Sequence, residues 1–140
     1  MIIIGSDHGG FALKQQLIDY LTQKGVRFVD KGTFTEDSVD YPDIAQAVCD
    51  EIGDGDLGVL ICGTGIGISI AANKHAGIRA ALCCTEYSAK MAREHNDANV
   101  LCLGGRVIGV ETAKAILDEF LSSSFSGGRH LNRVSKIEKE

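Results

Sequence analysis

The sequence predicts an α/β protein, a three-layer αβα sandwich built on a five-stranded parallel sheet. Five short apolar runs alternate along the 140 residues with segments of helical period. Nearly continuous apolar strands separated by helices are typical of a parallel sheet that is covered on both faces. With 44% hydrophobic and 24% charged residues, the chain is long enough for one filled core and short for two. We therefore expect a single domain over residues 1–140.

The expected helices carry apolar residues three and four positions apart, whereas the expected strands are continuous apolar runs. Phe11, Leu17 and Leu21 lie on one face of the first helix, which ends near Gly25. Pro42 stands where a second helix can begin, because proline is favoured in the first helical turn. Strands are predicted over residues 2–4, 26–29, 57–61, 78–82 and 100–103, and helices over 11–21, 42–52, 86–94 and 110–121.

The charge balance excludes several classes of partner. The chain has 19 acidic and 14 basic residues and a formal net charge of -5, so it has no general field that attracts nucleic acid or an anionic membrane. Residues 1–5 lack the regions of a signal peptide, and no apolar run approaches the length of a membrane span. We expect neither a nucleic-acid nor a membrane partner, and any anionic ligand must be held by local groups.

The cysteines indicate a reducing compartment. There are five of them, an odd number without a C-x-x-C pair, which fits neither a disulfide scaffold nor a zinc site. A cytoplasmic location is therefore expected.

The most informative segment is residues 61–67, which read Ile-Cys-Gly-Thr-Gly-Ile-Gly. An apolar strand runs into Cys62 and then into a glycine-rich turn, residues 63–67, which opens a helix; we call it the glycine turn. Exposed amides at a helix start bind anions, and the same field favours a thiolate. One turn can therefore supply a base and a clamp for an oxyanion.

Simpler interpretations of this segment exist. A cysteine that ends a strand is often a small buried hydrophobic residue, and glycines before a helix can serve tight packing alone. The pattern G-x-G-x-G differs from the G-x-G-x-x-G of dinucleotide sites, and no P-loop motif occurs anywhere in the chain. Nicotinamide cofactors and P-loop chemistry are therefore not predicted.

A second polar turn, residues 6–10, follows the first strand and contains Asp7 and His8. Ligands of such sheets lie beyond the carboxyl ends of the strands. If the first and third strands are neighbours, the two turns face each other. The alternative is that Asp7 caps a helix and His8 is solvated.

His95 occupies a different position. It ends the helical stretch before the fifth strand, so it is expected at the amino edge of the sheet, about 17 Å from the carboxyl edge. His95 is then either a structural histidine near a helix end or part of a site on a second subunit. We hypothesise the second.

Six segments together carry a family resemblance. They are residues 6–11, 40–42, 61–74, 77–80, 95–100 and 127–130, the last followed by Arg133. In this order, over almost the whole chain, they closely resemble type B ribose-5-phosphate isomerases, whose family also includes galactose-6-phosphate isomerase subunits. The resemblance implies a Rossmann-like fold and interconversion of ribose 5-phosphate and ribulose 5-phosphate without a metal or another cofactor.

The resemblance also implies residue roles. Cys62 resembles the base that moves a proton between C2 and C1, Thr64 a hydroxyl that helps move protons between the substrate oxygens, and His95, with Asp7 nearby, the acid that opens the sugar ring. Some branches of the family use a glutamate in the following helix, but this chain has Ile70-Ala71-Ala72 there. The implied substrate-binding residues are Asp7, His8, Tyr41, Gly63, Thr64, Gly65, Ile66, Gly67, Asn96, Arg106, Arg129 and Arg133.

The family pattern further implies a homodimer or homotetramer in which subunits share the active site and the tail, residues 122–140, contacts a partner. Guanidinium groups in that tail suit a phosphate, although they could equally be solvated charges. Two alternative functions remain open: isomerisation of a six-carbon sugar phosphate, such as galactose 6-phosphate or allose 6-phosphate, and a non-catalytic sugar-phosphate binding module.

Overall fold

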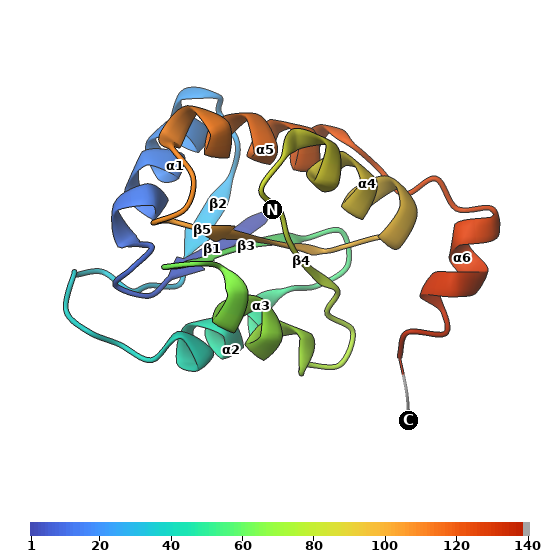
Figure 1. The fold of residues 1–140 in the computed structure, drawn as a ribbon, viewed down its shortest axis with the longest axis horizontal. Coiled ribbons are helices and arrows are strands. Elements are labelled where there is room, and N and C mark those ends of the chain that lie inside the picture. The colour runs from blue at the N-terminus through green and yellow to red at the C-terminus, as the bar shows by residue number, and fades with distance from the viewer. Residues whose placement is uncertain (139–140) are drawn as a thin grey trace.

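Five parallel strands form one sheet in the computed structural model, which describes residues 1–138 (Figure 1). The strands are β1 (Ile2–Ser6), β2 (Phe28–Asp30), β3 (Leu57–Cys62), β4 (Ala80–Leu82) and β5 (Val100–Gly104). Their order across the sheet is β2-β1-β3-β5-β4, and each neighbouring pair is parallel. The predicted sheet is confirmed, and β1 and β3 are neighbours.

Helices cover both faces of this sheet. The described helices are α1 (Phe11–Gln23), α2 (Tyr41–Glu51), α3 (Ile66–Asn73), α4 (Glu86–Asn96), α5 (Val110–Ser122) and α6 (Arg129–Val134). α1, α4 and α5 lie on one face, and α2 and α3 lie on the other, so the three-layer sandwich is confirmed (Figure 1). None of these helices combines the length and apolar character needed to span a bilayer.

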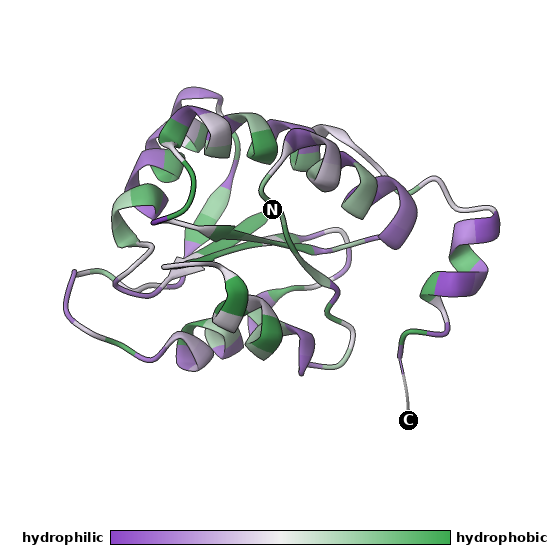
Figure 2. Ribbon diagram, in the orientation of Figure 1, coloured by the Kyte–Doolittle hydropathy of each residue, from purple (hydrophilic) through white to green (hydrophobic). Residues whose placement is uncertain are grey.

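The strands separate two apolar clusters because successive side chains point to opposite faces. Ile4 and Ile61 pack toward α1 and α5, whereas Ile3, Leu60 and Cys62 pack toward α2 and α3. Figure 2 shows the strands as predominantly hydrophobic and the helices as a mixture of hydrophobic and hydrophilic residues. Both clusters hold the sheet rigid beneath the turns that follow β1 and β3.

Two strands begin two residues later than predicted. The Val26 N–H donates to the Leu21 carbonyl at 2.9 Å, and the Ile78 N–H donates to the His75 carbonyl at 3.2 Å. Both apolar residues therefore close the turn after a helix instead of pairing with a strand. A hydrophobic run therefore locates each strand, but it does not show which of its residues pair with a neighbouring strand and which lie in the turn that closes the preceding helix.

The tail leaves the sandwich, and it contains the short helix α6, which the sequence did not predict. α6 lies beside the layers at one end of the molecule (Figure 1). The Ser126 N–H donates to the Glu94 carbonyl at 2.9 Å, and the Gly77 N–H donates to Glu138 Oε1 at 2.6 Å. Leu131 is 58% exposed. The single chain therefore leaves an apolar surface of the tail uncovered; residues 139 and 140 lie outside the described residues.

Candidate active site

The turns that follow β1 and β3 meet at the carboxyl edge of the sheet. The Asp7 N–H donates to the Ile61 carbonyl at 3.1 Å, which joins the two turns directly. A methyl group on Gly9 would lie only 3.0 Å from the Gly63 nitrogen, so the two backbones approach as closely as glycine allows. The predicted meeting of the two turns is confirmed.

Cys62 ends β3 beneath the glycine turn. Its side chain is 5% exposed, and its Sγ accepts a hydrogen bond from the Gly65 N–H at 3.1 Å. This donor distinguishes Cys62 from a purely apolar core cysteine, because an amide that donates to sulfur stabilises negative charge there. The geometry therefore suits a thiol that gives up its proton during a reaction.

The glycine turn supplies fewer free amides than its sequence predicts. The Gly65 N–H donates to Cys62, and the Ile66 N–H donates to Thr64 Oγ1 at 3.2 Å. Within residues 1–138, the Gly63, Thr64 and Gly67 N–H groups have no acceptor. These three amides before and at the start of α3 can donate to a bound anionic oxygen. The Thr64 side chain is exposed beside them.

Gly65 is required by the backbone as well as by packing. Its φ is +80°, and a methyl group there would lie 2.5 Å from Leu82 Cδ1 and 2.9 Å from the Leu103 carbonyl carbon. We expect Gly65→Ala to lower the free energy of unfolding by about 2–4 kcal/mol, measured by chemical denaturation. Gly55→Ala is the matched control, because its φ is +83° and its methyl group would meet nothing within 4 Å. Equal losses in the two variants would contradict a packing role for Gly65.

Asp7 and His8 are both engaged in hydrogen bonds. Asp7 is 6% exposed, and its Oδ1 accepts the N–H groups of Gly9 at 2.9 Å and Gly10 at 3.2 Å. His8 Nδ1 accepts the Val39 N–H at 3.2 Å. Asp7 therefore shapes the first turn but does not cap α1, whose N-cap is Gly10 without a side-chain cap. His8 is held by the loop that contains Val39, with its side chain partly exposed.

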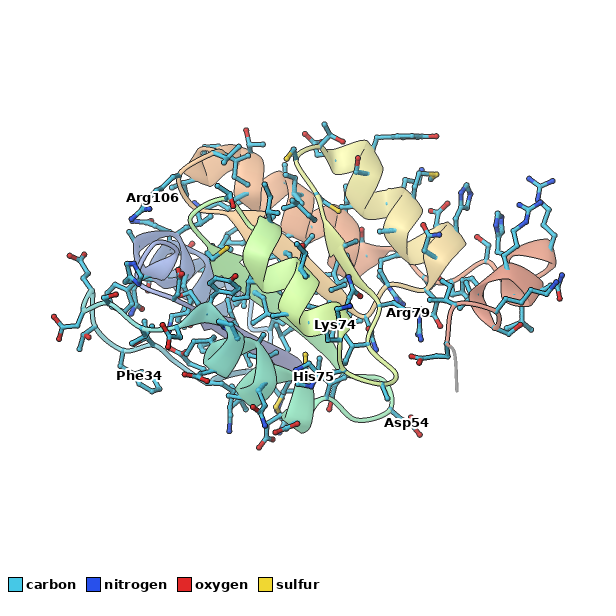
Figure 3. The ribbon with its side chains drawn as sticks, turned by 60° about the horizontal axis from the view of Figure 1, so that its bottom comes forward. Phe34, Asp54, Lys74, His75, Arg79 and Arg106 are labelled. Carbon is cyan, nitrogen blue, oxygen red and sulfur yellow. The ribbon has the colours of Figure 1, made fainter. Side chains whose placement is uncertain are left out.

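Tyr41 and Arg106 lie against opposite ends of the glycine turn. A methyl group on Gly67 would lie 2.6 Å from Cζ of Tyr41, and one on Gly63 would lie 3.2 Å from Nη1 of Arg106. Arg106 is exposed at the same end of the sandwich as Phe34 (Figure 3). A cation, an aromatic ring, a thiol and free amides therefore surround one turn.

The remaining predicted residues lie at the opposite edge of the sheet. His95 and Asn96 end α4, which runs back from the carboxyl edge, and the next strand begins at Val100, opposite Gly58 near the start of β3. Cys62 pairs instead with Gly104 at the far end of β5. The prediction that His95 cannot reach Cys62 within one chain is confirmed. Asp7 follows β1 at the carboxyl edge, so within one chain it is not a neighbour of His95 either.

α6 brings its residues to His95. The rings of His95 and His130 stack with centroids 4.2 Å apart and planes 11° apart. Arg129 and Arg133, four positions apart on α6, flank His130. Partial desolvation and the neighbouring His95, Arg129 and Arg133 lower the pKa of His130 below its usual value. His130 adjoins Arg129 in the quoted motif, but its sequence position alone indicates no role. The stack shows how the tail is oriented on α4.

The other cysteines are unsuited to react. Burial raises the pKa of Cys49 and of Cys83 to about 11, and it raises the pKa of Cys102 well above the usual value. Cys84 is exposed.

At about pH 8, we expect an alkylating reagent to label Cys84 first in the wild-type chain. In a Cys84→Ser variant, we expect it to label Cys62 first. Peptide mass mapping measures this order. Cys49, Cys83 and Cys102 should stay unlabelled because they are protonated and buried. Labelling of any of these three before Cys62 would contradict the assignment.

The structure thus gathers the predicted site residues into two groups, which we call half-sites. One contains Cys62, the free amides of the glycine turn, His8, Tyr41 and Arg106. The other contains His95, Asn96, Arg129 and Arg133. The first can remove and hold a proton beside a stabilised oxyanion, and the second can exchange a proton and bind phosphate.

Comparisons with known proteins agree with the quoted motifs. The profile of the Ribose/Galactose Isomerase family matches residues 2–137. Ribose-5-phosphate isomerase B of Escherichia coli (strain K12) is 50% identical over 138 residues, which are 97% of this chain and 93% of that protein.

Solved structures match closely as well. A crystal structure of a ribose 5-phosphate isomerase from Thermotoga maritima has a TM-score of 0.95 and 53% identity, covering 97% of this chain and 95% of that one. A ribose-5-phosphate isomerase B from Mycoplasma genitalium, with bound ribulose-5-phosphate, has a TM-score of 0.94 and 46% identity, covering 97% and 92%. The chain therefore belongs to the ribose/galactose isomerase family, as its motifs predicted, and is an isomerase.

Proposed function

We propose that the chain interconverts ribose 5-phosphate and ribulose 5-phosphate through an enediolate. Cys62 is the base, and His95 from a second subunit is the acid that opens the ring. The hydrogen bond from the Gly65 amide to Cys62 Sγ is the observation that carries this proposal, because it ties the sulfur to the glycine turn, in which the Gly63, Thr64 and Gly67 amides are free. The ribulose-5-phosphate bound to the Mycoplasma genitalium relative supports the choice of substrate.

The reaction requires a base and an oxyanion clamp in one place. The proton that moves between C2 and C1 is weakly acidic, so charge on the enediolate oxygen must be stabilised as it forms. A preorganised amide donor is worth about 3 kcal/mol in such a transition state. The free Thr64 and Gly67 amides fit this task, and Thr64 Oγ1 stands beside them to pass a proton between the two substrate oxygens.

Ring opening requires a separate proton carrier, since a cyclic sugar has no carbonyl group. Histidine exchanges protons near neutral pH, which suits this step. In a homodimer or homotetramer, the amino edge of one subunit would face the carboxyl edge of another and bring His95 and Asn96 to the half-site of Cys62. This arrangement also gives the exposed tail its partner contact. A cytoplasmic location remains a prediction from the cysteine content of the chain.

The phosphate is assigned to His8, Arg106, Arg129 and Arg133. Guanidinium groups bind phosphate oxygens in pairs and hold the part of the substrate that does not react. Arg106 lies against Gly63 in its own subunit. The two tail arginines would come from the partner.

Arg133→Ala is expected to raise KM for ribose 5-phosphate about tenfold while kcat changes little, because a bidentate contact to phosphate is worth about 1.5–3 kcal/mol. Lys136→Ala is the control, since Lys136 is an exposed cation one turn further along the tail. Steady-state kinetics measures both variants. An unchanged KM in Arg133→Ala would mean that Arg133 does not bind the phosphate and is a solvated charge of the tail.

A coupled assay that compares ribose 5-phosphate, galactose 6-phosphate and allose 6-phosphate tests the substrate. We expect the highest kcat/KM for ribose 5-phosphate. A higher kcat/KM for either six-carbon sugar phosphate would contradict the proposed substrate but not the proposed mechanism. Tight binding without turnover of any of the three would favour the sugar-phosphate binding module.

A further inference from the structure

Lys14 is a fully buried lysine in the apolar face of α1. Its exposed fraction is 0%, whereas lysine is almost never buried without a partner. Lys14 follows Phe11 by three positions and precedes Leu17 by three, so it occupies a position that the helical period reserves for a hydrophobic residue. Such a placement requires specific partners for the ammonium group.

Those partners lie where β2 ends and the next loop begins. Nζ of Lys14 donates to Asp30 Oδ1 at 2.7 Å and to the Thr33 carbonyl at 2.5 Å. Asp30 Oδ1 also accepts the Gly32 N–H at 2.9 Å. The ammonium lies 5.2 Å from the centroid of the Phe34 ring, and Phe34 is 67% exposed. The charge therefore fixes the first residues of the segment 31–40, which we call the β2–α2 loop.

The β2–α2 loop reaches the candidate active site at its other end. It forms a long excursion at one end of the sandwich, and Phe34 on it lies at the same end as Arg106 (Figures 1 and 3). The Val39 N–H donates to His8 Nδ1 at 3.2 Å. Tyr41, the first residue of α2, places its ring against Gly67. The loop thus carries a partner of His8 and leads directly into Tyr41, whose ring lies against the glycine turn.

We propose that Lys14 is a positioning residue that anchors the β2–α2 loop and thereby holds His8 and Tyr41 in the substrate site. This inference rests on the proposed function for its kinetic consequences. Lys14 touches no residue of the glycine turn among its polar contacts, so it acts through the loop. A hydrophobic residue would serve the core of α1 at least as well, because a buried ion pair contributes little to stability by itself.

Lys14→Met, Asp30→Asn and the double variant test the proposal. Methionine keeps the length of the stem without the charge, and asparagine keeps an acceptor for the Gly32 N–H. Lys24→Met is the matched control, because Lys24 caps the same helix and pairs with Asp118 at 2.8 Å on the surface, far along the helix from the loop. If Lys14→Met does not fold, Asp30→Asn carries the test alone.

Hydrogen exchange of the wild-type and variant chains is the first measurement. We expect amides of residues 31–41 to exchange about tenfold faster or more in Lys14→Met and Asp30→Asn, with β3 and β5 unchanged and with no further increase in the double variant. Lys24→Met should leave this loop as in the wild type. Unchanged loop exchange, or equal acceleration in the loop and the central strands, would overturn the proposal.

Kinetics is the second measurement. The same variants should raise KM for ribose 5-phosphate about tenfold while kcat stays within about threefold, because binding residues are displaced and the base is not. A faster-exchanging loop with an unchanged KM would overturn the positioning role. Hydrogen exchange does not depend on catalytic activity. A wild-type chain that is inactive on ribose 5-phosphate would therefore contradict the proposed function but not the anchoring of the loop by Lys14.

Discussion

Cys62→Ala is expected to lower isomerase activity by about 10³-fold or more, which is the size of effect that removal of a general base produces. The side chain ends β3 beneath the glycine turn and carries the sulfur that accepts the Gly65 N–H. Removing the sulfur leaves the Thr64 and Gly67 amides in place, so affinity for an inert sugar phosphate should change less than about threefold. Steady-state kinetics and calorimetric titration measure the two quantities.

Cys84→Ala is the control for this variant, because Cys84 is an exposed cysteine that follows β4 and is not part of the glycine turn. It should keep wild-type turnover. Near-normal turnover in Cys62→Ala would mean that the base is another group. Loss of ligand affinity together with turnover would instead mean that the substitution disturbs the glycine turn.

His95→Asn is expected to separate ring opening from proton transfer. Ribulose 5-phosphate is acyclic, because the oxygen that would close its ring carries the phosphate. The variant should lose about 10²-fold or more of its turnover of ribose 5-phosphate but should still exchange the C1 hydrogen of bound ribulose 5-phosphate with deuterium from solvent. Nuclear magnetic resonance in deuterium oxide measures this exchange, and Cys62→Ala should abolish it.

His75→Asn is the matched control for His95→Asn. His75 follows α3, and its backbone N–H donates to the Ala72 carbonyl in the closing turn of that helix, so its replacement should leave both readouts unchanged. Equal losses of turnover and deuterium exchange in His95→Asn would contradict a specific role in ring opening.

Much of the fold could be predicted from the sequence because buried parallel strands and amphipathic helices leave distinct patterns. The pairing of β1 with β3, and hence the meeting of the two turns, followed from common strand orders. The starts of β2 and β4 could not be predicted, since Val26 and Ile78 are as apolar in a helix-closing turn as in a strand. Short α6 has too few turns to show a period.

The candidate site could be predicted in part. The thiol and the glycine turn adjoin in sequence, and the position of His95 followed from the direction of α4. Which amides remain free depends on side-chain contacts such as Gly65 to Cys62, which no spacing reveals. The apolar members of its helix face do not reveal the role of Lys14, but a charged residue inside such a face is a signal for a buried pair.

In the proposed mechanism, a working site needs Cys62 from one subunit and His95 from another. Mixing and refolding Cys62→Ala with His95→Asn chains tests it most directly, because each mixed dimer would contain one site with both native residues and one with neither. Random exchange should restore about a quarter of wild-type activity from two nearly inactive parents. No recovery of activity, with mixed oligomers demonstrated by mass spectrometry, would contradict a shared site.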